Sequence, residues 1–451
     1  MKSGQCHEND IAQVVFLCCP SLPKFMGALH PAGALYAQPV NLKQAIDQHR
    51  AFRALLQRQG ILTLEVSQVL AHDTETSVNA RMDLEQLAAQ SLCYRAEPEC
   101  LSRFKALGGE YYISEEYKRL VLEAMSSDQL TDIVKTFPTV TITPSTRDTG
   151  VAASYAFQPL TNLVFTRDQQ VTTKKGIVLG RPSSVQREHE VNVMEFCFRK
   201  LGFKIIDRIP PPAHLEGGDF FPAGDDLCFI GVGLRTDMHA VMYMLEKDLF
   251  GTRKVAVVRD EYDHNQDRMH LDCVFNILSD DCVLLLEDMV GANNPIQRLV
   301  DEYVKKENGQ YVLERSNIEF SDYLRGQGYS IIFVPGKEQL QYGCNVLNLG
   351  NKNIVAVHPT TARRIAKAPC FDGNVEYINM SAITAMYGAA HCASQVVYRQ
   401  HVHDILTDDD DDEAKWVRWQ NEICGSPRRR QQVPTALENG CSGCCRHHRN
   451  D

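Results

Sequence analysis

The stretch "EGGDFFPAGDDLCFIGVG", residues 216–233, holds the pattern on which the fold prediction depends. Polar residues stand at the start of a short apolar strand, and a second apolar strand follows after a turn. The stretch "MHAVMYMLEKDLFG" (238–251) follows, with apolar residues at helical spacing, and "KVAVVRD" (254–260) then reads as a third strand. The segment therefore predicts a unit of strand, strand, helix and strand.

The same order recurs along the chain. Copies start near residues 162, 216, 270 and 345, so two spacings are 54 residues (216 − 162 and 270 − 216) and the third is 75 (345 − 270). The longer spacing contains an insertion around "VKKENGQYVLERSNIEF" (304–320). The segments "QVVFLCCPS" (13–21), "NLKQAIDQHRAFRALLQRQG" (41–60) and "ILTLEV" (61–66) form a partial fifth copy. Repeats of roughly this period favour a propeller or an array.

Two segments fall outside the repeat. Residues 72–136 read as an inserted helical block, with Ser114 as a helix cap. Residues 403–451 contain the run "DDDDDE" and a cysteine-containing end, and we expect them to be a disordered tail. The α/β catalytic domain is therefore predicted to comprise residues 11–71 and 137–402.

Composition narrows the class of protein. The chain has 451 residues, 44% of them hydrophobic, and a net charge of −10, with no basic stripe that would favour a nucleic-acid partner. It shows no secretory signal and no apolar run long enough to span a membrane. Sixteen cysteines in such a chain indicate reduced thiols and predict a cytoplasmic protein.

Polar residues cluster where the first strands of the repeats begin. If the repeats circle an axis, these openings converge on it. The segment "RMHLDCVFNIL" (268–278) reads as a strand in which His270 and Asp272 share one face. The other openings carry Asn162 to Asp168, Glu216 to Asp219, and His391 with Cys392.

This set of residue types is typical of nucleophilic catalysis. A cysteine thiolate attacks, an imidazole moves protons and a carboxylate orients the imidazole. Further carboxylates beside the thiol favour a planar cationic substrate such as a guanidinium. Taken singly, each element has a plainer interpretation: a solvated strand face, a glycine turn, or a buried structural thiol.

The motifs "TNLVFTRD", "HLEGGDF", "GVGLRTD", "HLDCVF" and a terminal glycine–His–Cys element resemble those of arginine deiminases, members of the guanidine-modifying pentein superfamily. The resemblance covers roughly residues 11 to 400 and includes the helical insertion. It implies a five-bladed α/β propeller of ββαβ units, in agreement with the repeat.

The resemblance also implies a role for each matching residue. Cys392 corresponds to the nucleophile, His270 to the general acid and base, and Glu216 to the residue that holds the imidazole. Asp168 and Asp272 correspond to the two carboxylates that grip the guanidinium. The remaining matches correspond to substrate-binding positions: Asn162, Arg187 and Arg235 at the amino-acid end of arginine, and Asp219 at a further contact.

The implied reaction is hydrolysis of L-arginine to citrulline and ammonia through a thiouronium on the cysteine, with no cofactor and no metal. The expected partner is this small substrate, not nucleic acid or a membrane, and a homo-oligomer is left open. Alternatives within the fold are an arginine dihydrolase that yields ornithine, an agmatine or methylarginine hydrolase, and an amidinotransferase. A non-catalytic arginine-binding propeller is the alternative of another class.

Three features depart from the family pattern. The sequence reads "GAA" before the His–Cys pair, where many members have "GGG", so Ala389 and Ala390 replace two glycines. An arginine that some members use for the substrate carboxylate is replaced near Tyr387. Cys344 opens a strand and competes with Cys392 for the role of nucleophile.

Overall fold

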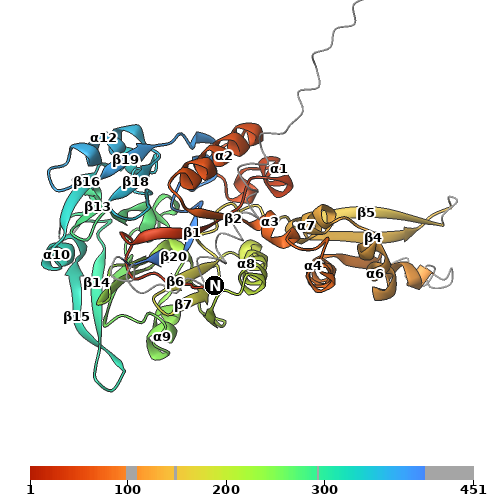
Figure 1. Ribbon diagram of the computed structural model, residues 1–451, viewed down its shortest axis with the longest axis horizontal. Coiled ribbons are helices and arrows are strands. Elements are labelled where there is room, and N and C mark those ends of the chain that lie inside the picture. The colour runs from red at the N-terminus through yellow and green to blue at the C-terminus, as the bar shows by residue number, and fades with distance from the viewer. Residues whose placement is uncertain (98–108, 147–149, 292–293, 402–451) are drawn as a thin grey trace, which may run out of the picture. The chain divides into compact units, whose positions relative to one another are not determined.

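Five small sheets share one strand pattern in the computed structural model, which describes residues 1–97, 109–146, 150–291 and 294–401 (Figure 1). In each, a first strand pairs antiparallel with a second, and the second pairs parallel with a third. A helix precedes each third strand, because parallel neighbours need a crossover connection. The predicted repeat of ββαβ units is therefore confirmed in five copies, which we call blades.

Each blade consists of three strands and one helix. The first contains β20 (Gln395–Gln400), β1 (Ile11–Leu17), α2 (Leu42–Arg58) and β2 (Leu62–Glu65). The second contains β6 (Gln170–Thr173), β7 (Gly176–Leu179), α8 (Glu188–Lys200) and β8 (Ile205–Arg208). The third contains β9 (Phe220–Pro222), β10 (Leu227–Val232), α9 (Met238–Glu246) and β11 (Lys254–Arg259). The fourth contains β12 (Phe275–Ile277), β13 (Cys282–Leu286), α10 (Phe320–Gly326) and β16 (Ser330–Val334). The fifth contains β17 (Leu347–Asn348), β18 (Asn353–Ala356), α12 (Pro359–Lys367) and β19 (Asn374–Tyr377).

The middle strands carry the core. Every residue of β7 and of β13 is buried, and in β10 all residues but the last are buried. Strands covered on both faces read as continuous apolar runs, and "CVLLL" in β13 is such a run.

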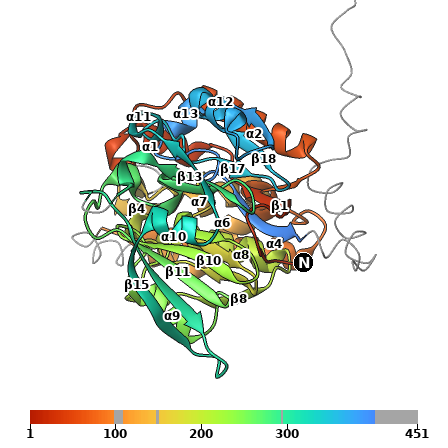
Figure 2. The ribbon, with the colours of Figure 1, turned by 90° about the vertical axis from the view of Figure 1, so that its left-hand side faces the viewer.

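The insertion between the third and fourth copies is a β-hairpin. Strands β14 (Leu299–Lys305) and β15 (Tyr311–Glu319) pair with each other, and β14 also pairs with β11. The third blade thereby becomes a five-stranded sheet with β15 at its edge (Figure 2). The extra residues lengthen one spacing of the repeat without interrupting it.

The block predicted to be helical is only partly so. It contains α4 (Val78–Ser91), α6 (Glu115–Glu123) and α7 (Ser127–Thr136), and the Ser114 side chain caps α6 by accepting the Tyr117 N–H. It also contains β3 (Cys93–Ala96), which pairs with β4 (Pro138–Pro144), and β4 pairs in turn with β5 (Val151–Phe157). Strands β4 and β5 therefore join the insertion and not a blade (Figure 1).

Short elements make the remaining connections. These are α1 (Leu22–Ala28), η1 (Ala32–Ala34), α3 (Val66–Ala71), η3 (Gly109–Ile113), η4 (Val185–Arg187), η5 (Gly217–Asp219), η6 (Gln266–Arg268), η7 (Leu271–Cys273), η8 (Glu287–Met289), α11 (Gly336–Gln339) and α13 (Ser381–Thr384). The predicted tail, residues 403–451, lies outside the described residues. Among the helices that are described, we find none with the length and apolar character needed to cross a bilayer.

The two ends of the described chain close the first blade. Strand β20 pairs antiparallel with β1, and Arg399 forms an ion pair with Glu8 in which both side chains are 0% exposed. Arg399 also donates to Gln5 Oε1 (2.8 Å) and to the Asp10 carbonyl (3.0 Å).

We expect Arg399→Met to destabilise the fold by about 3–5 kcal/mol, because the Glu8 carboxylate would stay buried without its partner. The matched control is Arg58→Met, which removes an exposed ion pair with Glu376 and should cost about 1 kcal/mol or less. Denaturant unfolding of both variants measures the difference. Equal losses would show that the buried pair does not hold the closing strand.

Candidate active site

The predicted catalytic groups lie just before the first strands of four blades. Asp168 precedes β6, Glu216 precedes β9, and Cys392 precedes β20. His270 and Asp272 both precede β12. All five side chains are buried, and their contacts form two groups, His270 with Glu216 and Asp168, and Cys392 with Asp272. Asp168, His270 and Cys392 line one cavity, so the structure brings the blade openings together as the repeat predicts.

The imidazole of His270 lies between two carboxylates. Its Nε2 is 2.9 Å from Glu216 Oε2, and its Nδ1 is 3.9 Å from Asp168 Oδ1. Glycine at position 218 permits this packing, since an added Cβ would lie 2.8 Å from the His270 ring. Glu216 is fixed in turn by Ser183, whose backbone N–H (2.9 Å) and hydroxyl (3.2 Å) donate to Oε1.

The sulfur of Cys392 has a different set of neighbours. Its Sγ lies 3.4 Å from Asp272 Oδ2 and 3.1 Å from the side-chain nitrogen of Asn345. The Asp272 carboxylate also contacts His391 Nδ1 at 2.8 Å, and the His391 ring stacks on Phe221 with a centroid distance of 5.1 Å. The Asp272 carboxylate thus contacts both the Cys392 thiol and the His391 imidazole.

The interpretation of residues 268–278 as one strand is wrong. Leu271–Cys273 form the 3₁₀ turn η7, in which the Cys273 N–H donates to the His270 carbonyl, and the strand begins only at Phe275. Because the turn replaces the pleat, His270 and Asp272 do not share a strand face. Instead His270 points towards Glu216, while Asp272 lies beside the Cys392 sulfur.

Arg187 makes several hydrogen bonds within the protein. Its guanidinium donates to Asp168 (2.7 Å), to Glu190 (2.9 Å) and to the carbonyls of Asn162 and Phe165. These internal bonds hold the guanidinium, and its charge balances buried carboxylates. Arg187 therefore positions Asp168, and its contact with a substrate carboxylate stays a prediction.

A small cavity gives access to the thiol. Cys392, His270 and Asp168 line it together with Asn162, Arg187 and Arg235, and its wall is completed by Leu35, Phe165, Gln266, Met269, Met386 and Tyr387. The Asn162 side chain donates to the Ala34 carbonyl at 3.1 Å. Arg235 donates to Gln266 (3.0 Å) and keeps a buried Nε without a partner among the described residues. Asp168 Oδ1 and His270 Nδ1 are likewise buried without a hydrogen-bond partner there.

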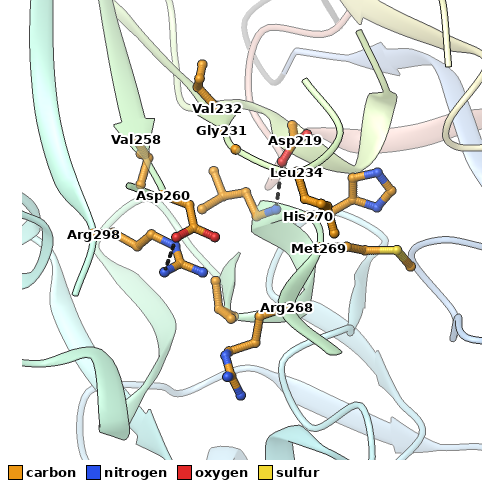
Figure 3. Close-up of a pocket in the computed structure, with 13 residues that line it drawn as sticks. Asp219, Gly231, Val232, Leu234, Val258, Asp260, Arg268, Met269, His270 and Arg298 are labelled. Atoms are coloured by element: carbon orange, nitrogen blue, oxygen red, sulfur yellow. Dashed lines mark hydrogen bonds and ion pairs between the residues drawn. The ribbon is translucent and has the colours of Figure 1, made fainter. Parts of the chain in front are cut away.

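Asp219 and His270 both line a neighbouring small pocket (Figure 3). Its Oδ1 accepts the Leu271 N–H at 2.9 Å, and it is not among the residues that line the cavity with Cys392. Asp219 thus holds the turn after His270 through a backbone contact, and its contact with a substrate stays a prediction.

The charges of the site oppose the effects of burial. Burial lowers the pKa of His270, but Asp168, Glu216 and Asp219 outweigh it and raise that pKa to about 10. Burial raises the pKa of Glu216, but His270, Arg187 and Arg235 outweigh it and lower that pKa to about 2.

At Cys392 the two effects act together. Burial, followed by the charge of Asp272, raises the pKa of the Cys392 thiol well above its usual value. At neutral pH the resting site therefore holds an imidazolium and a protonated thiol.

Asp168, Glu216 and His270 could also present ligand atoms to a metal, since these atoms lie within 4.8 Å of one another. The Arg187 guanidinium is 2.7 Å from Asp168 and 3.8 Å from Glu216. A fixed positive charge at this position opposes a second cation, so the donor set fits a metal poorly.

The three departures from the family pattern have distinct surroundings. Ala389 and Ala390 are fully buried in the same apolar cluster as Cys392. Tyr387 lines the cavity with a φ of 68°, a conformation that costs a non-glycine residue roughly 1 kcal/mol or more. Cys344 packs in a separate apolar cluster with Leu278 and Cys282, and burial raises the pKa of its thiol.

Two contacts in the surroundings of the thiol were not predicted from the sequence. Asn345 touches the sulfur, and His391 holds Asp272, although His391 was placed at the blade opening without a role. The signal for Asn345 was the repeat itself, because it stands at the opening of the fifth blade, next to Cys344.

The openings of the ββαβ blades supply a buried thiol, an imidazole held by a carboxylate and a second carboxylate, which is the arrangement expected of the pentein class. The chain belongs to the arginine deiminase family, whose sequence profile matches residues 33–399. The arginine deiminase of Halobacterium salinarum is 26% identical over 322 residues, which are 54% of this chain and 65% of that protein. This chain thus spans just under two thirds of that relative. The arginine deiminase of Streptococcus pyogenes serotype M49 is 24% identical over 340 residues, 71% of this chain and 79% of that protein.

Solved structures of related hydrolases resemble the fold. A dimethylarginine dimethylaminohydrolase from Pseudomonas aeruginosa, complexed with citrulline, matches with a TM-score of 0.48 and 16% identity, covering 85% of this chain and 98% of that one. The N-terminal domain of a cyanobacterial arginine dihydrolase, bound to product, matches with a TM-score of 0.49 and 14% identity, covering 86% and 98%.

Proposed function

We propose that this protein hydrolyses L-arginine to citrulline and ammonia. The observation that carries the proposal is the cavity in which Cys392, His270 and Asp168 meet, with Asp168 Oδ1 and His270 Nδ1 buried and without a hydrogen-bond partner among the described residues. A guanidinium bound there would donate to Asp168 and place its carbon beside the sulfur.

The first half of the reaction forms a thiouronium. A guanidinium entering the site brings a positive charge next to the thiol, which opposes the effect of Asp272 and favours loss of the thiol proton to solvent, leaving the thiolate. The Cys392 sulfur attacks the guanidinium carbon. The His270 imidazolium gives its proton to the leaving nitrogen, ammonia departs, and the remaining carbon stays bonded to sulfur.

The second half returns the enzyme. His270, now neutral, takes a proton from water as the water oxygen attacks the same carbon, and the carbon–sulfur bond breaks to release citrulline and the thiolate. Glu216 holds the imidazole through both halves, and Arg187 holds Asp168 in place.

Arg235 is the residue that we assign to the substrate carboxylate, because its Nε has no partner within the described chain and it lines the cavity. Agmatine, which lacks the carboxylate, is the second candidate substrate. The internal bonds of Arg187 and the tyrosine at position 387 favour agmatine, since they leave fewer cations for a carboxylate.

We expect the purified protein, without added metal, to release citrulline and ammonia from L-arginine and to act at least about ten-fold more slowly on agmatine, which forfeits the bond to Arg235. Mass spectrometry of the products decides between the candidates. Ornithine as the main early product would favour a dihydrolase, and faster turnover of agmatine would contradict the assignment of Arg235. Binding of arginine without turnover would favour a non-catalytic propeller.

A further inference from the structure

The fifth blade supplies a residue that contacts the Cys392 thiol and has no role in the proposed reaction steps. Four blades place Asp168, Glu216, His270 with Asp272, and Cys392 before their first strands. The fifth blade places Asn345 before β17, and this side chain is fully buried. Every blade opening thus reaches the same site.

All the hydrogen-bonding groups of the Asn345 amide are used. Its oxygen accepts the backbone N–H groups of His391 (3.2 Å) and Cys392 (3.3 Å). Its nitrogen donates to the Asp272 carbonyl (3.2 Å) and to Cys392 Sγ (3.1 Å). Backbone N–H groups can only donate and a carbonyl can only accept, so these contacts fix the orientation of the amide. The group that faces the sulfur is therefore an N–H donor.

The sulfur needs such a donor because one of its close polar neighbours is an anion. Asp272 Oδ2 lies 3.4 Å away and repels a thiolate. An N–H directed at sulfur favours the charged form over the neutral thiol, since hydrogen bonds to charged groups are the stronger ones.

We propose that Asn345 is a catalytic residue that stabilises the Cys392 thiolate and holds its backbone in the attacking position. This rests on the proposed function for its role in turnover, whereas its effect on the thiol does not. Two amide contacts support its preorganisation: Asn276 Nδ2 donates to the carbonyls of Cys344 (3.2 Å) and Val346 (2.8 Å), on either side of Asn345.

The chain offers a matched control in Asn348. This asparagine is also fully buried and also bridges two blades, since its Nδ2 donates to the carbonyls of Ile277 and Leu278 at 3.1 Å. It makes no contact with Cys392 in the described structure. Asn348→Ala therefore removes a comparable structural bond and leaves the surroundings of the sulfur unchanged.

The test compares Asn345→Ala with Asn348→Ala by the rate at which iodoacetamide alkylates the Cys392 peptide, followed by mass spectrometry across pH. We expect Asn345→Ala to raise the midpoint of this profile by about one to two pH units. We expect kcat for arginine to fall by about a hundred-fold, with a smaller change in KM. Asn348→Ala should leave the midpoint unchanged.

Identical alkylation midpoints for the two variants would overturn the proposal. If Asn345→Ala does not fold, Asn345→Ser decides, because its hydroxyl is too short to reach the sulfur and the same shift is expected. Absence of arginine turnover in the wild type would overturn the proposed function alone. The alkylation profile would still decide the role of Asn345.

Discussion

Cys392→Ser is expected to lower turnover of L-arginine by on the order of 10⁶-fold, as removal of a nucleophile does in other covalent hydrolases. The serine hydroxyl is a far poorer nucleophile than a thiolate, and the site holds no base beside it: the nearest carboxylate, Asp272, already contacts His391. The cavity keeps Asp168 and Arg235, so the variant should still bind arginine. Steady-state kinetics and calorimetric titration separate the two effects.

The control for this variant is Cys344→Ser. Cys344 packs in an apolar cluster outside the cavity, so its replacement should retain a substantial part of the activity. A Cys392→Ser enzyme that remains active, or a Cys344→Ser enzyme that loses turnover while it stays folded, would contradict the assignment of the nucleophile.

Glu216→Gln is expected to lower turnover by on the order of 10³- to 10⁴-fold, as replacement of the carboxylate that orients a catalytic histidine does elsewhere. The substitution also removes a charge that helps to raise the pKa of His270 to about 10 against the effect of burial. With a lower pKa, the imidazolium that protonates the leaving nitrogen is lost at lower pH. The alkaline limb of the kcat profile should therefore move towards neutral pH.

The matched control is Glu188→Gln, which alters a part-exposed carboxylate 3.5 Å from Arg181 and should leave the pH profile unchanged. A Glu216→Gln enzyme whose alkaline limb coincides with that of the wild type would show that Glu216 does not govern the proton on His270.

The repeat could be read from the sequence because each blade carries its own apolar strands, and burial on both faces makes those strands continuous apolar runs. Strand β3 was missed because "CYRA" is short and half-exposed and depends on pairing with β4, far along the chain. The turn at Leu271–Cys273 was missed because alternating polar and apolar residues fit a strand and a single 3₁₀ turn equally well.

The sequence predicted which residues gather at the candidate site better than it predicted which of them contact one another. Asp168, His270 and Cys392 each stand at a blade opening. Their equivalent positions in the repeat are enough to predict that they lie close together. The partner of Arg187 is decided by side-chain geometry between distant segments, so the sequence cannot tell a carboxylate within the protein from that of a substrate. Asn345 was overlooked because an asparagine before a short strand reads as a turn residue.

The covalent step is the central claim, and acid quenching during turnover tests it most directly. Wild-type protein incubated with L-arginine, quenched in acid, digested and examined by mass spectrometry should carry the amidino adduct of arginine on the peptide that contains Cys392. An adduct on the Cys344 peptide, or citrulline formation without an adduct on any cysteine at quench times shorter than one turnover, would contradict the account.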